Sequence, residues 1–123
     1  MALAGPAAHV GSPAEVEAAD LVINATPLGM GVVVTTAGEP EPLPVDLARL
    51  GAGQVVVDLV YHPAVTPLLA AARDQGLRTV NGLGMLIHQA AHAFRTWTNE
   101  EPPLEAMSAA ALGALLHRGQ EMH

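Results

Sequence analysis

The chain has 123 residues, of which 50% are hydrophobic, and it contains no cysteine and no lysine. Such a length supports one domain with a modest core, which here must be mainly aliphatic. Disulfides, thiolate-held zinc and lysine-based catalysis are excluded within these residues. A formal charge of −7 and only three aromatic residues argue against nucleic-acid binding through bulk charge or base stacking.

No stretch of the sequence has the roughly 18 apolar residues that a membrane span requires. The first residues also lack the charged segment of a secretory leader. Because cysteine is absent, the redox compartment is not indicated by composition. We therefore expect a cytoplasmic protein that does not associate with membranes.

The first third of the chain predicts one short helix and one short strand. Ser12 followed by Pro13 is a typical helix start, and it introduces a short helix over residues 14–19. Residues 20–24 form an apolar run of strand length. Residues 25–44 are rich in glycine and proline and predict a long loop, with a short extended piece at residues 32–35.

The middle of the chain predicts the most deeply buried strand. Residues 45–50 indicate one or two helical turns that stop at the following glycines. Residues 54–60 are rich in consecutive valines without alternation, which is typical of a parallel strand buried on both faces. Thr66 and Pro67 then open a helix that extends to residue 75 and ends at Gly76.

The last third predicts a short strand and two helices. Residues 77–80 form the strand, and the turn at 81–84 leads into a helix that reaches about residue 97. A break at 99–103 precedes a final helix over residues 104–117. Alternating strands and helices predict an α/β fold with about three parallel strands, flanking helices and right-handed crossovers. The first strand would lie at an unpaired edge of this thin sheet.

Polar or glycine-rich residues follow all three predicted strands. Ligands of open α/β sheets bind beyond the carboxyl ends of the strands, so these residues would line one crevice. Candidates are Asn24, Thr26, Asp58, Tyr61 and the turn at 81–84. Structural roles remain open for each: Asn24 and Thr26 could satisfy a turn, Asp58 could cap a loop, and Tyr61 could lie in the core.

The helix after Gly84 has two faces of interest. One carries apolar side chains that we expect to pack on the sheet: Leu86, Ala90, Ala93 and Trp97. The other carries Met85, Gln89 and His92. A thioether suits a flat ring, and an amide can bind a hydroxyl or carboxylate, although the residues by themselves favour a core or surface role for this face.

Two further patterns begin a known ligand-binding motif but do not complete it. His88 and His92 have a spacing seen in metal sites, but no third ligand is evident, so we expect no metal. Gly82-Leu-Gly84 begins the G-x-G-x-x-G fingerprint, but Ile87 stands where its third glycine is needed. A complete dinucleotide site is therefore not expected within the chain.

Three ordered motifs resemble shikimate dehydrogenase. They are DLVINATPLGM at residues 20–30, VDLVYHPAVTPLL at 57–69 and NGLGMLIHQAAHAF at 81–94, and the resemblance covers residues 20–110. It implies a partial Rossmann-like three-layer domain, with residues 1–123 forming the C-terminal half of an NADP-binding domain. The last helix and tail, 103–123, would pack back toward a substrate domain.

The family reduces 3-dehydroshikimate to shikimate reversibly with NADPH, in aromatic amino acid biosynthesis, and has quinate-using relatives. The resemblance implies cofactor contacts at six positions: Asn24, Ala25, Thr26, Leu59, Gly82 and Met85. Among these, Met85 would pack against the nicotinamide ring. Contacts to shikimate or 3-dehydroshikimate are implied at Tyr61 and Gln89.

Several parts of the family pattern are missing from the chain. They are the catalytic Lys–Asp pair and carboxylate-binding serines of the N-terminal domain, the glycine-rich phosphate loop, and the Asn-Arg-Thr segment for the 2′-phosphate. We therefore expect no catalytic residue here, weak NADP binding, and no activity without the N-terminal half as partner. A second hypothesis is a non-catalytic assembly module that forms homo-oligomers through its edge strand or a swapped last helix.

Overall fold

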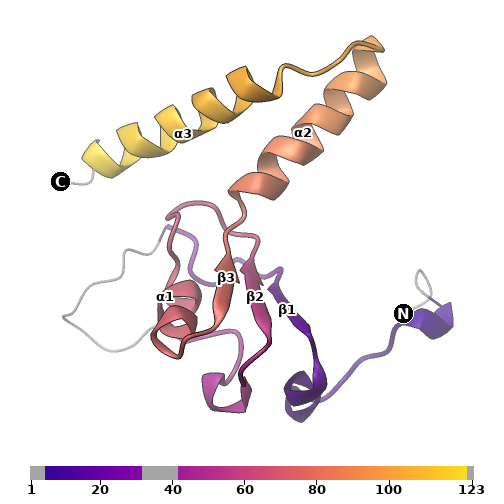
Figure 1. The fold of residues 1–123 in the computed structure, drawn as a ribbon, viewed down its shortest axis with the longest axis vertical. Coiled ribbons are helices and arrows are strands. Elements are labelled where there is room, and N and C mark those ends of the chain that lie inside the picture. Colours follow the sequence, from indigo (N-terminus) through magenta and orange to yellow (C-terminus); the bar gives the residue numbers. More distant parts are fainter. Residues whose placement is uncertain (1–4, 32–41, 122–123) are drawn as a thin grey trace.

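The computed structural model describes residues 5–31 and 42–121, and side chains through Arg118. Its sheet has three parallel strands in the order β1-β2-β3, as the sequence predicts (Figure 1). Their bounds are β1 Leu21–Asn24, β2 Val55–Asp58 and β3 Arg78–Val80. The register pairs Ile23 with Val57 and Val57 with Val80, so β1 is an edge strand.

The strand predicted over residues 54–60 is shorter in the structure, where β2 ends at Asp58. The next residues leave the ladder but keep backbone hydrogen bonds to both neighbours. Leu59 N donates to Asn24 O at 3.1 Å, and Gly82 N donates to Val60 O at 3.2 Å. The segment after β2 is therefore fixed between the ends of β1 and β3.

Helix α1 (Pro67–Asp74) forms where the sequence predicts it, because its first and last residues carry the expected signals. Thr66 is the N-cap, and its hydroxyl accepts a hydrogen bond from Leu69 N at 3.3 Å. Gly76, at φ +78°, follows the end of the helix. The helix buries Leu68, Leu69 and Ala72 on one face of the sheet, where Val56, Leu50 and Leu77 complete the core.

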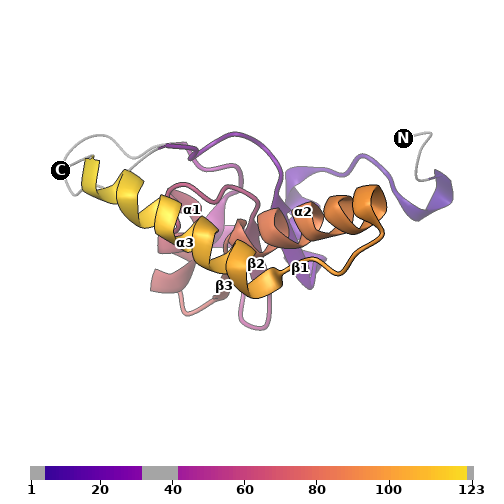
Figure 2. The ribbon, with the colours of Figure 1, turned by 90° about the horizontal axis from the view of Figure 1, so that it is seen from above.

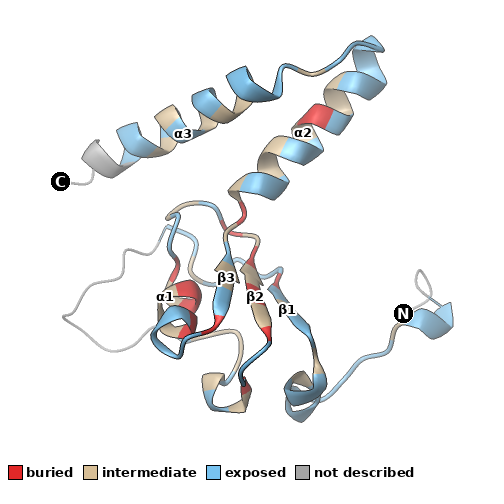
Figure 3. Ribbon diagram, viewed as in Figure 1, coloured by how far each residue is buried: buried red, intermediate tan, exposed pale blue. Residues whose placement is uncertain are grey.

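The opposite face of the sheet is bare within the described residues. Leu21, Ile23 and Val80 are each about half exposed on that face, at 51%, 52% and 51% (Figure 3). Parallel sheets are normally covered on both faces, because crossover helices pack on each. The described residues thus form a sheet with only one of its two covering layers.

Helices α2 (Leu83–Thr98) and α3 (Leu104–Glu121) form a hairpin beyond the carboxyl ends of the strands (Figures 1 and 2). Asn99 ends α2 in the left-handed conformation at φ 57°, and its amide donates to Arg95 O at 2.8 Å. An ion pair between Arg95 and Glu101 at 2.9 Å spans the connection. The two helices pack on each other.

The predicted sheet-packing role of one α2 face is wrong. Leu86, Ala90 and Ala93 are only half-buried, and Trp97 is 82% exposed. The helix projects away from the sheet and contacts α3 instead (Figure 1). Helical spacing identifies an apolar face, but it does not identify the partner of that face.

Three short 3-10 helices complete the described part: η1 (Gly5–Ala7), η2 (Pro13–Ala18) and η3 (Leu47–Arg49). The last two fall where the sequence predicts short helices, although their turns are tighter than α-helical ones. Arg49 pairs with Glu17 at 2.8 Å and joins η3 to η2. The extended piece predicted at residues 32–35 lies outside the described residues. None of the described helices has the length and apolar character to cross a membrane.

Candidate functional site

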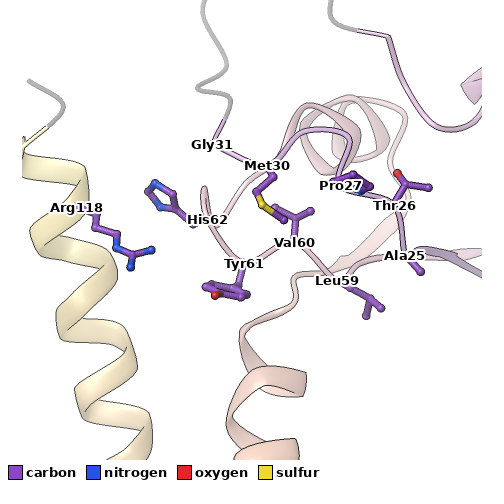
Figure 4. Close-up of a pocket in the computed structure, with 10 residues that line it drawn as sticks. All are labelled: Ala25, Thr26, Pro27, Met30, Gly31, Leu59, Val60, Tyr61, His62 and Arg118. Atoms are coloured by element: carbon purple, nitrogen blue, oxygen red, sulfur yellow. The ribbon is translucent and has the colours of Figure 1, made fainter.

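A pocket of about 460 Å³ lies at the carboxyl ends of β1 and β2 (Figure 4). Its volume is within the range of small-molecule sites, about 300–1,000 Å³. It is formed by the segment after β1, the segment after β2 and one side chain of α3. The lining residues are Ala25, Thr26, Pro27, Met30, Gly31, Leu59, Val60, Tyr61, His62 and Arg118.

The segment after β1 is shaped by the side chain of Asn24, which is 4% exposed. Its Oδ1 accepts hydrogen bonds from Thr26 N at 3.0 Å and from Thr26 Oγ1 at 2.6 Å. Its Nδ2 donates to Asp58 Oδ1 at 3.1 Å and to Leu28 O at 3.4 Å. This side chain folds the chain into a tight turn and also ties the turn to β2.

The segment after β2 depends in the same way on Asp58, which is fully buried. Its Oδ1 accepts from Val60 N at 3.1 Å as well as from Asn24, and its Oδ2 accepts from Thr66 Oγ1 at 2.7 Å. Buried polar groups of this kind are tolerated when their hydrogen bonds are satisfied. Among the described residues, no buried side-chain nitrogen or oxygen lacks a partner.

Gly82 lies behind the pocket wall, against the backbone of Leu59. A Cβ at this position would lie 2.0 Å from Leu59 O, so the position requires glycine for close approach of two backbones. The neighbouring Asn81 donates from Nδ2 to Ala64 O at 3.3 Å. The turn after β3 therefore presses against the residue that forms the pocket wall.

The predicted site residues divide into three groups. Four of them line the pocket: Ala25, Thr26, Leu59 and Tyr61. Asn24 and Gly82 lie behind its walls, where they hold the two segments in place. Met85 and Gln89 do not line it: both are exposed on α2, and Gln89 Nε2 donates to Leu86 O at 3.0 Å.

Sequence reasoning missed six lining residues: Pro27, Met30, Gly31, Val60, His62 and Arg118. Most continue segments that had been identified, and Gly31 N donates to His62 O at 2.8 Å, which joins the two segments. Arg118 is different, because no local signal connects it to the strand ends. The side chain extends from α3 toward Tyr61 and His62 (Figure 4).

The chemistry of the pocket is mainly apolar, with a few polar groups. None of its lining residues is acidic, although the chain carries a net charge of −7. Thr26 and Tyr61 contribute hydroxyls, and Met30 and Leu59 contribute soft or aliphatic surface. Such walls suit a flat ring with hydrogen-bonding groups at its edge.

The described residues contain no group of three or more possible ligands that could hold a metal ion. His88 and His92 are both exposed on α2. Glu15 is the group whose pKa is resolvably shifted in the described part, and it lies at η2, outside the pocket. Its pKa lies below the ordinary value because the His9 ring and the Ser12 backbone amide donate hydrogen bonds to the carboxylate.

A parallel α/β sheet with a pocket at its strand ends places the chain among Rossmann-like domains. Comparison with known proteins shows similarity to shikimate dehydrogenases. Residues 82–112 match the profile described as "Shikimate 5'-dehydrogenase C-terminal domain". A shikimate dehydrogenase (NADP(+)) from Moorella thermoacetica is 50% identical over 97 residues, which are 79% of this chain and 31% of that protein.

Solved structures of shikimate and quinate dehydrogenases are also similar to the chain. A shikimate 5-dehydrogenase from Thermus thermophilus, in complex with NADP(H) and shikimate, superposes with a TM-score of 0.72 at 34% identity. The match covers 85% of this chain and 38% of that one. Quinate dehydrogenase from Corynebacterium glutamicum, in complex with NAD, gives a TM-score of 0.67 at 39% identity, over 82% of this chain and 33% of that one.

The chain is thus similar to part of the shikimate dehydrogenases, and its residues 82–112 match their C-terminal-domain profile. It spans about a third of the length of these relatives.

Proposed function

We propose that these residues supply the nicotinamide side and part of the substrate side of an NADP-dependent shikimate dehydrogenase. The observation that carries the proposal is the pocket at the ends of β1 and β2. It gathers Ala25, Thr26, Leu59 and Tyr61, four residues for which the family resemblance implies contacts to cofactor or substrate.

The residues present fit the nicotinamide end of NADP better than its phosphates. Leu59 and Ala25 offer apolar surface for a flat ring and exclude water from it. Phosphates require a cradle of backbone amides or several basic side chains, and a single arginine lines the pocket. The cofactor supplies the hydride chemistry when it is bound, and this chain positions the nicotinamide.

Tyr61 is the residue best suited to meet the substrate. The residue is 36% exposed and lines the pocket, and its hydroxyl can donate to a substrate carboxylate or exchange a hydrogen bond with a substrate hydroxyl. Gln89 and Met85 would join the site from α2 when the substrate domain packs against this helix. Gln89 would then exchange its bond to Leu86 O for one to the substrate.

The 123-residue chain is inactive by itself under this proposal. It contains no lysine, so the lysine of the family's proton-transfer pair has to come from the remaining part of the enzyme. Asp58 does not replace it, because its carboxylate is fully buried and already accepts three hydrogen bonds. Residues 1–123 then act as the C-terminal half of the NADP-binding domain.

The hairpin of α2 and α3 supports a second part of this proposal, that residues 103–123 reach back to the substrate domain. The hairpin projects beyond the strand ends, away from the sheet (Figure 1). Trp97 and Leu116 remain 82% and 70% exposed on it, as expected for surfaces that meet another domain.

Complementation tests the proposed activity. The 123-residue chain is mixed with the preceding two thirds of the Moorella thermoacetica relative, and NADP(+)-dependent oxidation of shikimate is followed by NADPH absorbance. We expect no turnover from either part alone and measurable turnover from the mixture. Turnover by the 123-residue chain alone contradicts the proposed division of the active site, and an inactive but associated mixture contradicts the proposed function.

An assembly module is the second candidate function, favoured by the bare face and the free edge of the sheet. Leu21, Ile23 and Val80 form an apolar surface on a sheet whose edge strand β1 pairs with β2 alone within the described residues. A second copy could cover this surface, or α3 could be exchanged between copies. Light scattering over a range of concentrations distinguishes the candidates: a strict monomer that complements the other part excludes the assembly role.

A further inference from the structure

We propose that Asp58 is a positioning residue that couples the two walls of the pocket, so that the cofactor side and the substrate side hold their geometry together. The proposal rests on the proposed function for what the walls bind. It goes beyond that function because Asp58 is fully buried and lines no part of the pocket.

One carboxylate oxygen of Asp58 accepts hydrogen bonds from residues on both sides of the pocket. Asp58 Oδ1 accepts from Asn24 Nδ2 at 3.1 Å and from Val60 N at 3.1 Å. Asn24 sets the turn that presents Ala25 and Thr26, and Val60 lies between Leu59 and Tyr61 in the second wall. A shift of this carboxylate oxygen therefore displaces both walls.

The second oxygen links the walls to the core. Asp58 Oδ2 accepts from Thr66 Oγ1 at 2.7 Å, and the same Thr66 oxygen accepts from Leu69 N at the start of α1. Thr66 and Leu69 are both fully buried. The carboxylate is thus anchored to the fully buried core, as the support of a precise site requires.

The donor pattern explains why this position suits a carboxylate better than an amide. All three partners of Asp58 donate: an amide NH₂, a backbone N–H and a hydroxyl. A carboxylate only accepts, whereas an asparagine would direct an NH₂ group at one of the two oxygen positions. If that group faced Thr66, the threonine hydroxyl would have to accept from it while still accepting from Leu69 N.

Amide hydrogen exchange in the 123-residue chain tests the coupling without any ligand. The variants are Asp58→Asn and Thr66→Val, with Thr66→Ser as the conservative variant that keeps the hydroxyl. Val56→Ala is the matched control, because it weakens the buried core on the same strand without touching the network. Exchange at the Thr26 and Val60 amides is compared with exchange in β2 and α1.

We expect Asp58→Asn and Thr66→Val to accelerate exchange at Thr26 by about tenfold beyond any acceleration in β2, as loss of a hydrogen bond to a charged group implies. Thr66→Ser restores the slow rate, and Val56→Ala changes all sites by one common factor. Thr26 makes no hydrogen bond to Thr66, so a role of Thr66 in capping α1 alone predicts no such selective effect.

Two results would overturn the proposal: uniform acceleration in Asp58→Asn and Thr66→Val, or no acceleration at Thr26. The test is independent of the proposed function, because exchange is measured on the free chain. If complementation fails but exchange at Thr26 is still selectively accelerated, the proposed function is contradicted and the proposed coupling stands. If complementation succeeds but exchange is accelerated uniformly, only the proposed coupling is contradicted.

Discussion

The two faces of the sheet differ in a way that explains what the chain can and cannot do alone. One face is covered by α1, and its residues Val56 and Leu69 are completely buried. The other face leaves Leu21, Ile23 and Val80 half exposed. Stability is concentrated on the first face, and the second is the surface that a further layer would cover. The pocket lies where the strands end, supported from the covered side.

Truncating one buried residue on the covered face and one exposed residue on the bare face should affect stability very differently. Leu69→Ala on the covered face should reduce the free energy of unfolding by about 3 kcal/mol, because it leaves a cavity among fully buried neighbours. Ile23→Ala on the bare face should cost less than about 1 kcal/mol, since the side chain is 52% exposed. Urea denaturation measures both, and equal losses would mean that the bare face is covered in solution.

The next largest effect concerns the turn behind the pocket. Gly82→Ala should cost about 2 kcal/mol, because the new Cβ collides with Leu59 O and the wall must move. Gly84→Ala is the control, since nothing lies within 4 Å of its Cβ and alanine favours a helix. Thermal unfolding should therefore show a lower Tm for the first variant and an unchanged or higher Tm for the second.

A smaller effect, confined to the pocket, is expected for Tyr61→Phe in the complemented enzyme. Loss of one hydrogen bond to substrate should raise the KM for shikimate by about fivefold, while the KM for NADP(+) stays constant. The Tm should change little, because the tyrosine ring lies at the pocket surface, 36% exposed, and phenylalanine keeps its packing. Equal changes in both KM values would place Tyr61 outside the substrate side.

The smallest effect is a pH dependence at η2, far from both faces. Glu15 has a pKa below its ordinary value of 4.5, because it accepts hydrogen bonds from His9 and from the Ser12 amide. Its contribution to stability is therefore present above pH 4.5 and is lost as the pH falls through the lower, folded-state value. Glu15→Gln should flatten the fall in Tm between about pH 5 and about pH 3, where the unfolded state takes up more protons. An identical fall in both proteins would exclude this contribution.

Local signals account for the parts of the fold that the sequence predicts well. Ser12-Pro13, Thr66-Pro67 and Gly76 mark helix ends through backbone geometry, and consecutive valines mark the buried strand. Partners of surfaces are not local. The apolar stripe that ends at Trp97 shows that α2 has an apolar face, but it does not show that the helix packs on α3. Trp97 itself stays exposed, because no element among the described residues covers it.

The residues of the pocket show the same difference between local signals, which the sequence contains, and non-local contacts, which it does not. Asn24, Thr26 and Tyr61 could be found because parallel strands end at one edge, and the segments after β1 and β2 line the pocket there. Arg118 could not be found, because its place depends on the hairpin turn between two helices. The role of Asp58 was an open alternative in the sequence, and its three hydrogen bonds in the structure decide for the capping role.

The central claim, that these residues hold the nicotinamide end of the cofactor, is tested most directly by saturation-transfer NMR of NADP(+) with the 123-residue chain. The account predicts stronger transfer to the nicotinamide protons than to the adenine protons, and loss of that preference in Gly82→Ala but not in Gly84→Ala. Transfer that favours adenine, or equal transfer to both rings, would contradict it.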